Sequence, residues 1–323
     1  MENFRLKSQR WKQAISLFVK IALLTFVLMI VMGISSGIAG LNMTGLVSDP
    51  TQVMGATLLV FFLQTVALSW VIVRSKLSNL HLIVLVSCLY FGLSVFLVQI
   101  ETLVFLDFFT EIIDPQMIPQ LFIQGGLTSL IFAPIAVIIL RGRKPSENTK
   151  LQSINLGMTK IQGLVKISFL AATFVVFYVF FGIFVAWQNP AMSDYYGDLI
   201  TQMAKVGTMM LLLQAGRAVV FVVLAFPVIK TAKGKTLEKA LVVALLFSVL
   251  TAANLLIPTS IMPDTIRMSH FIEVVIPAFI FGILVVWLMH RSHRSFSDLL
   301  RPSVNSILVE EKREADQEAV ISL

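Results

Sequence analysis

Charged residues are scarce in this sequence. Of its 323 residues, 25 are Lys or Arg and 18 are Asp or Glu, together 13%, whereas soluble globular domains hold about a quarter. Hydrophobic residues make up 57% of the chain, and the mean hydropathy is +0.88. This composition excludes a disordered chain, a fibrous chain and an ordinary soluble enzyme, and it indicates an integral membrane protein.

Cysteine is nearly absent as well. Cys88 is the one cysteine and lies inside an apolar run, so the sequence offers no disulfide and no thiolate metal site. The formal net charge of +7 would suggest nucleic-acid binding in a soluble protein, but here the basic residues flank apolar stretches, and membrane orientation explains them. We therefore expect no nucleic-acid partner and no cofactor, and we expect the lipid bilayer to surround the chain.

Eight stretches are long enough and free enough of charge to cross a bilayer. A hydrocarbon core of about 30 Å requires roughly 20 helical residues. The stretches are 21–40, 51–73, 77–100, 115–140, 167–187, 206–229, 240–258 and 268–289. Only helices satisfy their own backbone polar groups along such isolated runs, so the predicted fold class is all-α, a polytopic bundle of eight transmembrane helices.

Basic residues gather on one side of the predicted membrane topology. The segments on that side hold 22 Lys and Arg residues, whereas the opposite loops hold only Lys205 and Arg267. Those opposite loops are acidic and contain Asp49, Asp107, Glu111, Asp114, Asp194, Asp198 and Asp264. By the positive-inside rule both termini are predicted to be cytoplasmic. The expected location is the cell membrane, as a multi-pass protein, with a bacterial plasma membrane as the default.

The two halves of the sequence resemble each other. Residues 19–21 match 165–167, residues 63–64 match 213–214, and residues 121–124 lie against 270–273. The offsets of such matches stay between 146 and 150 residues. Each half holds four spans, an even number, so both copies would enter the membrane in the same orientation. The pattern predicts a parallel repeat of two four-helix units.

This repeat gives the expected division of the chain. The predicted parts are a cytoplasmic N-terminal segment (1–13), a first four-helix repeat (14–141), a cytoplasmic linker (142–160), a second four-helix repeat (161–294) and a cytoplasmic polar tail (295–323). The linker is rich in Lys, Asn and Ser, as connecting segments commonly are.

Three charged residues lie within or close to the ends of the apolar spans. A charge at the bilayer centre costs on the order of 2.5 to 3.5 kcal/mol on insertion scales, so such residues need a partner or a wet cavity. From the helical rise, Glu273 lies roughly 10 to 15 Å inside the outer surface, Arg217 slightly deeper, and Glu101 near the outer end of its span. The candidate ligand-binding residues are Arg217, Glu273, His270, Gln214, Gln64, Gln124 and Glu101.

Two interpretations of these residues stay open. In one, Arg217 pairs with Glu273 or Glu101 in an outward-facing polar cavity that binds a small polar or charged solute. In the other, an internal ion pair locks the spans together, and Glu101 extends to the outer interface. The His270-x-x-Glu273 spacing supplies two metal ligands at most, which is too few for a usual site, so a hydrogen-bonding wall of the cavity is expected there rather than a metal.

Three functions are compatible with this pattern. The first is a transporter or solute-binding membrane protein with its site between the two halves. The second is an intramembrane enzyme acting on a lipid-type substrate, with His270 and Glu273 as acid and base. The third is a non-catalytic sensor or assembly subunit. The sequence contains no established catalytic signature, which favours a protein that is not an enzyme, and it predicts no particular oligomeric state.

Overall fold

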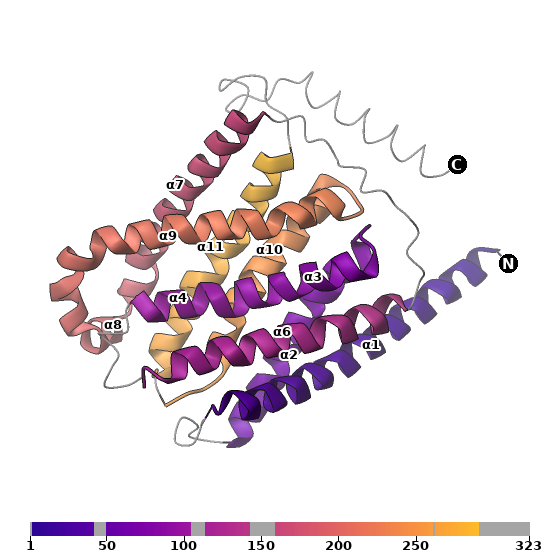
Figure 1. Cartoon of the computed structure of the whole chain (residues 1–323), viewed down its shortest axis with the longest axis horizontal. Coiled ribbons are helices and arrows are strands. Elements are labelled where there is room, and N and C mark those ends of the chain that lie inside the picture. Colours follow the sequence, from indigo (N-terminus) through magenta and orange to yellow (C-terminus); the bar gives the residue numbers. More distant parts are fainter. Residues whose placement is uncertain (1, 42–49, 105–113, 143–158, 261, 291–323) are drawn as a thin grey trace.

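The computed structural model of the chain is helical throughout the part that it describes. It describes residues 2–41, 50–104, 114–142, 159–260 and 262–290. The α-helices are α1 (Glu2–Ala39), α2 (Pro50–Arg74), α3 (Asn79–Tyr90), α4 (Leu97–Val104), α6 (Met117–Arg141), α7 (Lys160–Phe184), α8 (Pro190–Tyr195), α9 (Gly197–Thr231), α10 (Thr236–Ala252) and α11 (Asp264–His290). Figure 1 shows them arranged as one bundle.

Within the described residues, eight helical segments are long and apolar enough to cross a membrane. This confirms the prediction of an all-α chain with eight candidate spans, but three helices begin well before the predicted stretches: α1 at Glu2, α7 at Lys160 and α9 at Gly197. Residues 2–13 of the predicted N-terminal segment 1–13 thus belong to α1. Large apolar side chains are exposed on the outside of the bundle, among them Ile30, Leu130 and Leu212. Contact with lipid removes the cost that water would impose on such surfaces.

The sequence predicts one continuous helix for the third span, but the structure shows an interrupted α-helix. A π-helical segment, Phe91–Phe96, separates α3 from α4. A Cβ atom on Gly92 would lie 2.6 Å from a methyl group of Leu224 in α9, and one on Gly125 in α6 would lie 2.3 Å from a methyl group of Val95. The span therefore passes between two helices where the absence of glycine side chains leaves room. Such wide turns often occur beside functional residues.

Helix packing follows the same scheme in the two halves when α1, α2, α3 and α6 are compared with α7, α9, α10 and α11, in that order. In the first half α1 contacts α2 and α6, and α3 contacts α6; in the second half α7 contacts α9 and α11, and α10 contacts α11 (Figure 1). Between the halves, α2 packs against α10, and the third span packs against α9. Glycine again allows close approach, because a Cβ atom on Gly282 of α11 would lie 2.5 Å from the Cα atom of Ala244 in α10.

Two short loops join the halves at one end of the bundle. Ser75 and Ala232, each the first residue after its helix, form an antiparallel bridge. The Lys76 amide donates to the Thr231 carbonyl (2.8 Å), and the Lys233 amide donates to the Arg74 carbonyl (2.7 Å). The ends of α2 and α9 are 157 residues apart in the sequence. Residues 63–64 match 213–214 at an offset of 150, so the two offsets differ by seven residues, or about two helical turns.

An aromatic cluster fills the middle of the second half. Phe174 stacks near Phe221 (ring centroids 5.4 Å) and Phe281 (4.8 Å), and Phe247 lies 4.5 Å from Phe221. These rings come from α7, α9, α10 and α11, and Phe221, Phe247 and Phe281 are almost completely buried. The cluster packs the four helices together. It lies on the side of the Ser75–Ala232 bridge relative to the polar residues described next.

Candidate functional site

A cavity of about 400 Å³ lies among the helices of the second half. Residues of α7, α8, α9, α10 and α11 line it, and α4 of the first half closes one side. Phe174 and Phe221 form part of its wall, so the cavity borders the aromatic cluster. Its volume is within the range of small-molecule sites, and its wall is mostly apolar with a few converging polar groups.

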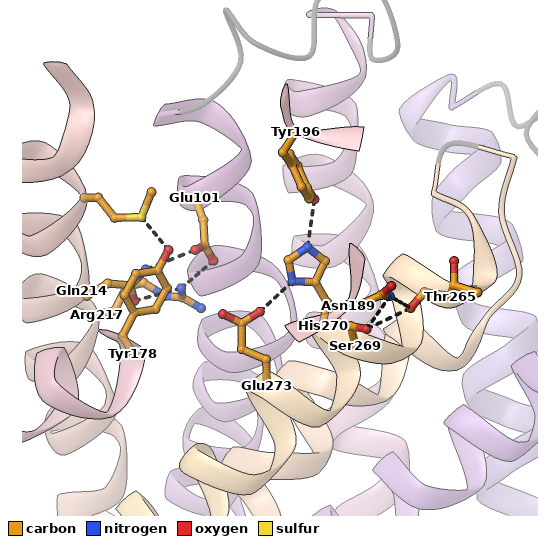
Figure 2. A network of polar contacts seen from close by, with 11 residues as sticks. Glu101, Tyr178, Asn189, Tyr196, Gln214, Arg217, Thr265, Ser269, His270 and Glu273 are labelled. Carbon is orange, nitrogen blue, oxygen red and sulfur yellow. Dashed lines mark hydrogen bonds and ion pairs between the residues drawn. The ribbon is translucent and has the colours of Figure 1, made fainter. Parts of the chain in front are cut away.

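One polar network in this wall is built around Arg217. Its Nη1 atom donates to Oε2 of Glu101 (2.5 Å) and to Oε1 of Gln214 (3.1 Å), and Nε2 of Gln214 donates to Oε1 of Glu101 (3.1 Å) (Figure 2). The side chain of Arg217 is 9% exposed and that of Glu101 is 32% exposed. A carboxylate of α4 is thus held against a guanidinium and an amide one helical turn apart on α9.

A second network starts from α11. Nδ1 of His270 lies 2.7 Å from Oε2 of Glu273, and Nε2 of the same ring lies 2.8 Å from the hydroxyl of Tyr196 (Figure 2). Burial, together with Tyr195 and the two carboxylates, raises the pKa of Tyr196, so the phenol keeps its proton at neutral pH. If the phenol donates to Nε2, then Nδ1 carries the ring proton and donates to Glu273.

The segment between α7 and α9 places Tyr196 over this imidazole. The Asn189 side chain caps α8 by accepting from the Ala191 amide, and its amide nitrogen donates to Ser269 Oγ (3.0 Å) and to the Thr265 carbonyl (3.2 Å). These bonds fix the start of α8 to α11. Asn189-Pro190 is a helix-start signature, an N-cap followed by proline at N1, and it could have predicted this short helix from the sequence.

Tyr178 of α7 also lines the cavity, and Figure 2 shows its ring in front of Gln214 and Arg217. Its hydroxyl donates to the sulfur atom of Met210. One turn further along α7, Gly182 faces Glu273, since a Cβ atom there would lie 3.4 Å from Oε1. The aromatic ring and the glycine together let α7 approach the charged groups closely.

Five of the seven residues proposed from the sequence line the cavity: Arg217, Glu273, His270, Gln214 and Glu101. Arg217 pairs with Glu101, and Glu273 pairs with His270. The other two do not line it. Gln64 donates to Oδ1 of Asn254 (3.1 Å), whose side chain is in the cavity wall, and Gln124 bonds to Ser36 (2.5 Å) within the first half.

The aromatic wall was not predicted from the sequence. Tyr178, Trp187 and Tyr196 line the cavity, but aromatic residues in or near apolar spans are too common to indicate a site. Within the described part of the chain, no group of three or more His, Cys, Asp or Glu residues is placed to hold a metal ion.

No family model matches the chain, and comparisons with curated proteins and with solved structures likewise find no match.

Proposed function

We propose that this chain is a multi-pass membrane protein that binds a small polar or charged solute in this cavity and transports it. The observation that carries the proposal is the convergence of two charged networks, from α4, α9 and α11, on one cavity of about 400 Å³. Charged groups inside an apolar bundle are costly, and they commonly mark solute pathways.

A purely structural ion pair would be expected to have its remaining polar atoms satisfied and to be closely packed. Here Nε of Arg217 is buried with no hydrogen-bond partner among the described residues, and an open volume lies beside the pair. Protein interiors are otherwise close-packed, and buried polar atoms are almost always bonded. Both departures favour a binding site over a structural lock.

The sidedness of the cavity follows from the loop charges. Arg74, Lys76, Lys233 and Lys235 lie at the end of the bundle that carries the Ser75–Ala232 bridge. By the positive-inside rule this end is cytoplasmic, and the cavity, which lies toward the opposite end of the same helices, faces outward. The linker 142–160 lies mostly outside the described residues, and the tail 295–323 and the outer acidic residues Asp49, Asp107 and Glu111 lie wholly outside them.

A parallel repeat would supply the moving parts for transport. The equal helix pairings in the two halves and the equal four-residue loops that meet at the bridge support such a repeat. Alternating access is commonly achieved when one repeat rocks against the other around a fixed site. The bridge would then be the pivot, and the π-helical turn in the third span would absorb bending beside Glu101.

Water access to the cavity tests this proposal. In a Cys88→Ser background, Val274→Cys places a thiol in the cavity wall, and Ile276→Cys places one on the outer, exposed face of α11 half a turn away. Thiols ionise and react in water but not in lipid. We expect a membrane-impermeant maleimide to label the cysteine at 274 at least about tenfold faster than the one at 276, in protein reconstituted in nanodiscs.

Equal, slow labelling at both positions would contradict a solute cavity and would favour a sealed bundle. Cysteine at Lys233, which is exposed at the bridge end, serves as the positive control for reagent activity.

An intramembrane enzyme is the second candidate. The Tyr196–His270–Glu273 chain favours it, because a carboxylate that orients an imidazole next to a hydroxyl is the arrangement that activates a nucleophile. An aryl sulfonyl fluoride, which modifies activated hydroxyls, separates the two functions. An enzyme predicts modification of Tyr196 that His270→Gln abolishes, whereas the transport proposal predicts none.

A further inference from the structure

We propose that the solute is a monovalent organic cation with an apolar body. This inference rests on the proposed function, because it names the ligand of the same cavity. It follows from the charges of the wall, from the aromatic rings that surround them and from the size of the space.

The positive charge of the wall is already compensated. Arg217 is the cavity's only Lys or Arg among the described residues, and its Nη1 atom is bonded to Glu101 and Gln214. Its Nε atom is buried and has no hydrogen-bond partner among the described residues. An anionic ligand would therefore have to share the guanidinium with Glu101, in a cavity that holds two carboxylates.

The second carboxylate, that of Glu273, has no Lys or Arg partner among the described residues. Its Oε2 atom lies 2.7 Å from Nδ1 of the His270 imidazole. Its side chain is 12% exposed. With a neutral imidazole, Glu273 leaves the wall with one net negative charge. A neutral ligand would leave that charge uncompensated in an apolar setting, which is costly.

Aromatic rings line the same cavity as this carboxylate. Trp187 and Tyr196 lie 6.1 Å apart between ring centroids, Tyr196 lies 5.7 Å from His270, and Tyr178 and Phe174 line the α7 side. The faces of such rings attract cations, and quaternary ammonium groups are recognised in this way. A carboxylate beside several rings is a complementary setting for an organic cation that has shed part of its water.

The cavity is much larger than a bare metal ion requires. A cavity of about 400 Å³ accommodates a small organic molecule, and the lower wall around Phe174 and Phe221 is apolar. The ligand would place its charged group near Glu273 and Tyr196 and its apolar part over the aromatic cluster.

Three probes of nearly equal shape test the inference. Benzyltrimethylammonium is the cation, neopentylbenzene is its uncharged carbon counterpart, and phenylmethanesulfonate is the anion. Binding to the full chain in nanodiscs is followed by Trp187 fluorescence, with Trp187→Phe protein and empty nanodiscs as blanks. We expect the cation to bind at least about tenfold more tightly than either analogue, the size of a difference of one close charge pair.

Variants identify the carboxylate responsible. Glu273→Gln should weaken cation binding at least about tenfold, whereas Glu238→Gln, a matched change at the bridge end of the bundle, should leave it unchanged. Melting temperatures of both variants check that each is folded. Tighter binding of the anion, or equal binding of all three probes that Glu273→Gln does not alter, would overturn the cation assignment and leave the solute cavity standing.

Failure of every probe to bind is read together with the thiol labelling. If no probe binds up to millimolar concentration while the cysteine at 274 reacts rapidly, the cation assignment is wrong and the cavity stands. If no probe binds and the cysteine at 274 is inert, the proposed function itself is wrong.

Discussion

Replacing Glu101 by leucine is expected to lower the free energy of unfolding by about 3 to 5 kcal/mol, the cost of leaving a buried charge without its partner. The residue left behind would be Arg217, whose side chain is only 9% exposed and has no other carboxylate partner among the described residues. Gln214 would still accept one hydrogen bond from it, but an amide does not neutralise a guanidinium. The insertion cost of the arginine would then oppose folding of the bundle.

Substitution of Arg217, the other member of the pair, should lower the free energy of unfolding by less. Arg217→Met leaves Glu101 without its guanidinium, but that carboxylate is 32% exposed and lies at the end of α4, so water can reach it. Removing both charges should cost less than Glu101→Leu alone. Unfolding titrations of the two single variants and the double variant in mixed micelles give the coupling free energy directly. Additive losses in the double variant would contradict the pairing, and equal losses from the two single variants would contradict the expected effect of their different exposure.

A side chain at position 282 is expected to damage the fold about as severely. A Cβ atom there would lie 2.5 Å from Cα and 2.7 Å from the backbone nitrogen of Ala244, and neither atom can move aside by changing a rotamer. Gly282→Val would force α10 and α11 apart along the most extensive helix contact of the second half. Overpacking typically costs about 1 to 3 kcal/mol, and contact with backbone places this substitution at or beyond the upper end.

Gly55→Val in α2 is the matched control, because a Cβ atom on Gly55 would meet nothing within 4 Å. Both glycines are helical and uncharged, so only the neighbouring helix differs. We expect the melting temperature and the yield of folded protein to fall sharply for the substitution at 282 and to change little at 55. Similar behaviour of the two variants would show that α10 and α11 do not approach as closely as described.

The eight spans were predictable because the bilayer imposes length and composition directly on the sequence. The internal structure of the third span was not. Its π-helical turn depends on Gly92 meeting Leu224 and on Gly125 meeting Val95, contacts between residues far apart in the chain. Hydropathy does not reveal such contacts.

The charged members of the cavity could be predicted, but their pairing could not. Glu101, Arg217 and Glu273 stand out because charge is rare in apolar spans. Which carboxylate meets Arg217 depends on the packing of α4 against α9, and the sequence left both pairings open. Tyr178 and Trp187 carry no comparable signal, because aromatic residues fill membrane helices for many reasons.

The internal repeat stays a prediction. The equal helix pairings favour it, yet the loops at the bridge correspond at an offset of 157 residues, outside the range of 146 to 150 given by the sequence matches. An insertion of two helical turns in α9 relative to α2 would reconcile the two offsets, since seven residues change the facing of a helix very little.

The sidedness of thiol labelling at position 274 tests the central claim most directly. Cysteines at Val274 and at Lys233 are compared in intact cells and in inverted membrane vesicles, each in the Cys88→Ser background. The account predicts that an impermeant maleimide labels the cysteine at 274 in cells and the one at 233 in inverted vesicles, because the cavity and the bridge lie at opposite ends of the bundle. Labelling of both positions from the same side, or of the cysteine at 274 from neither side, would contradict an outward-facing solute cavity.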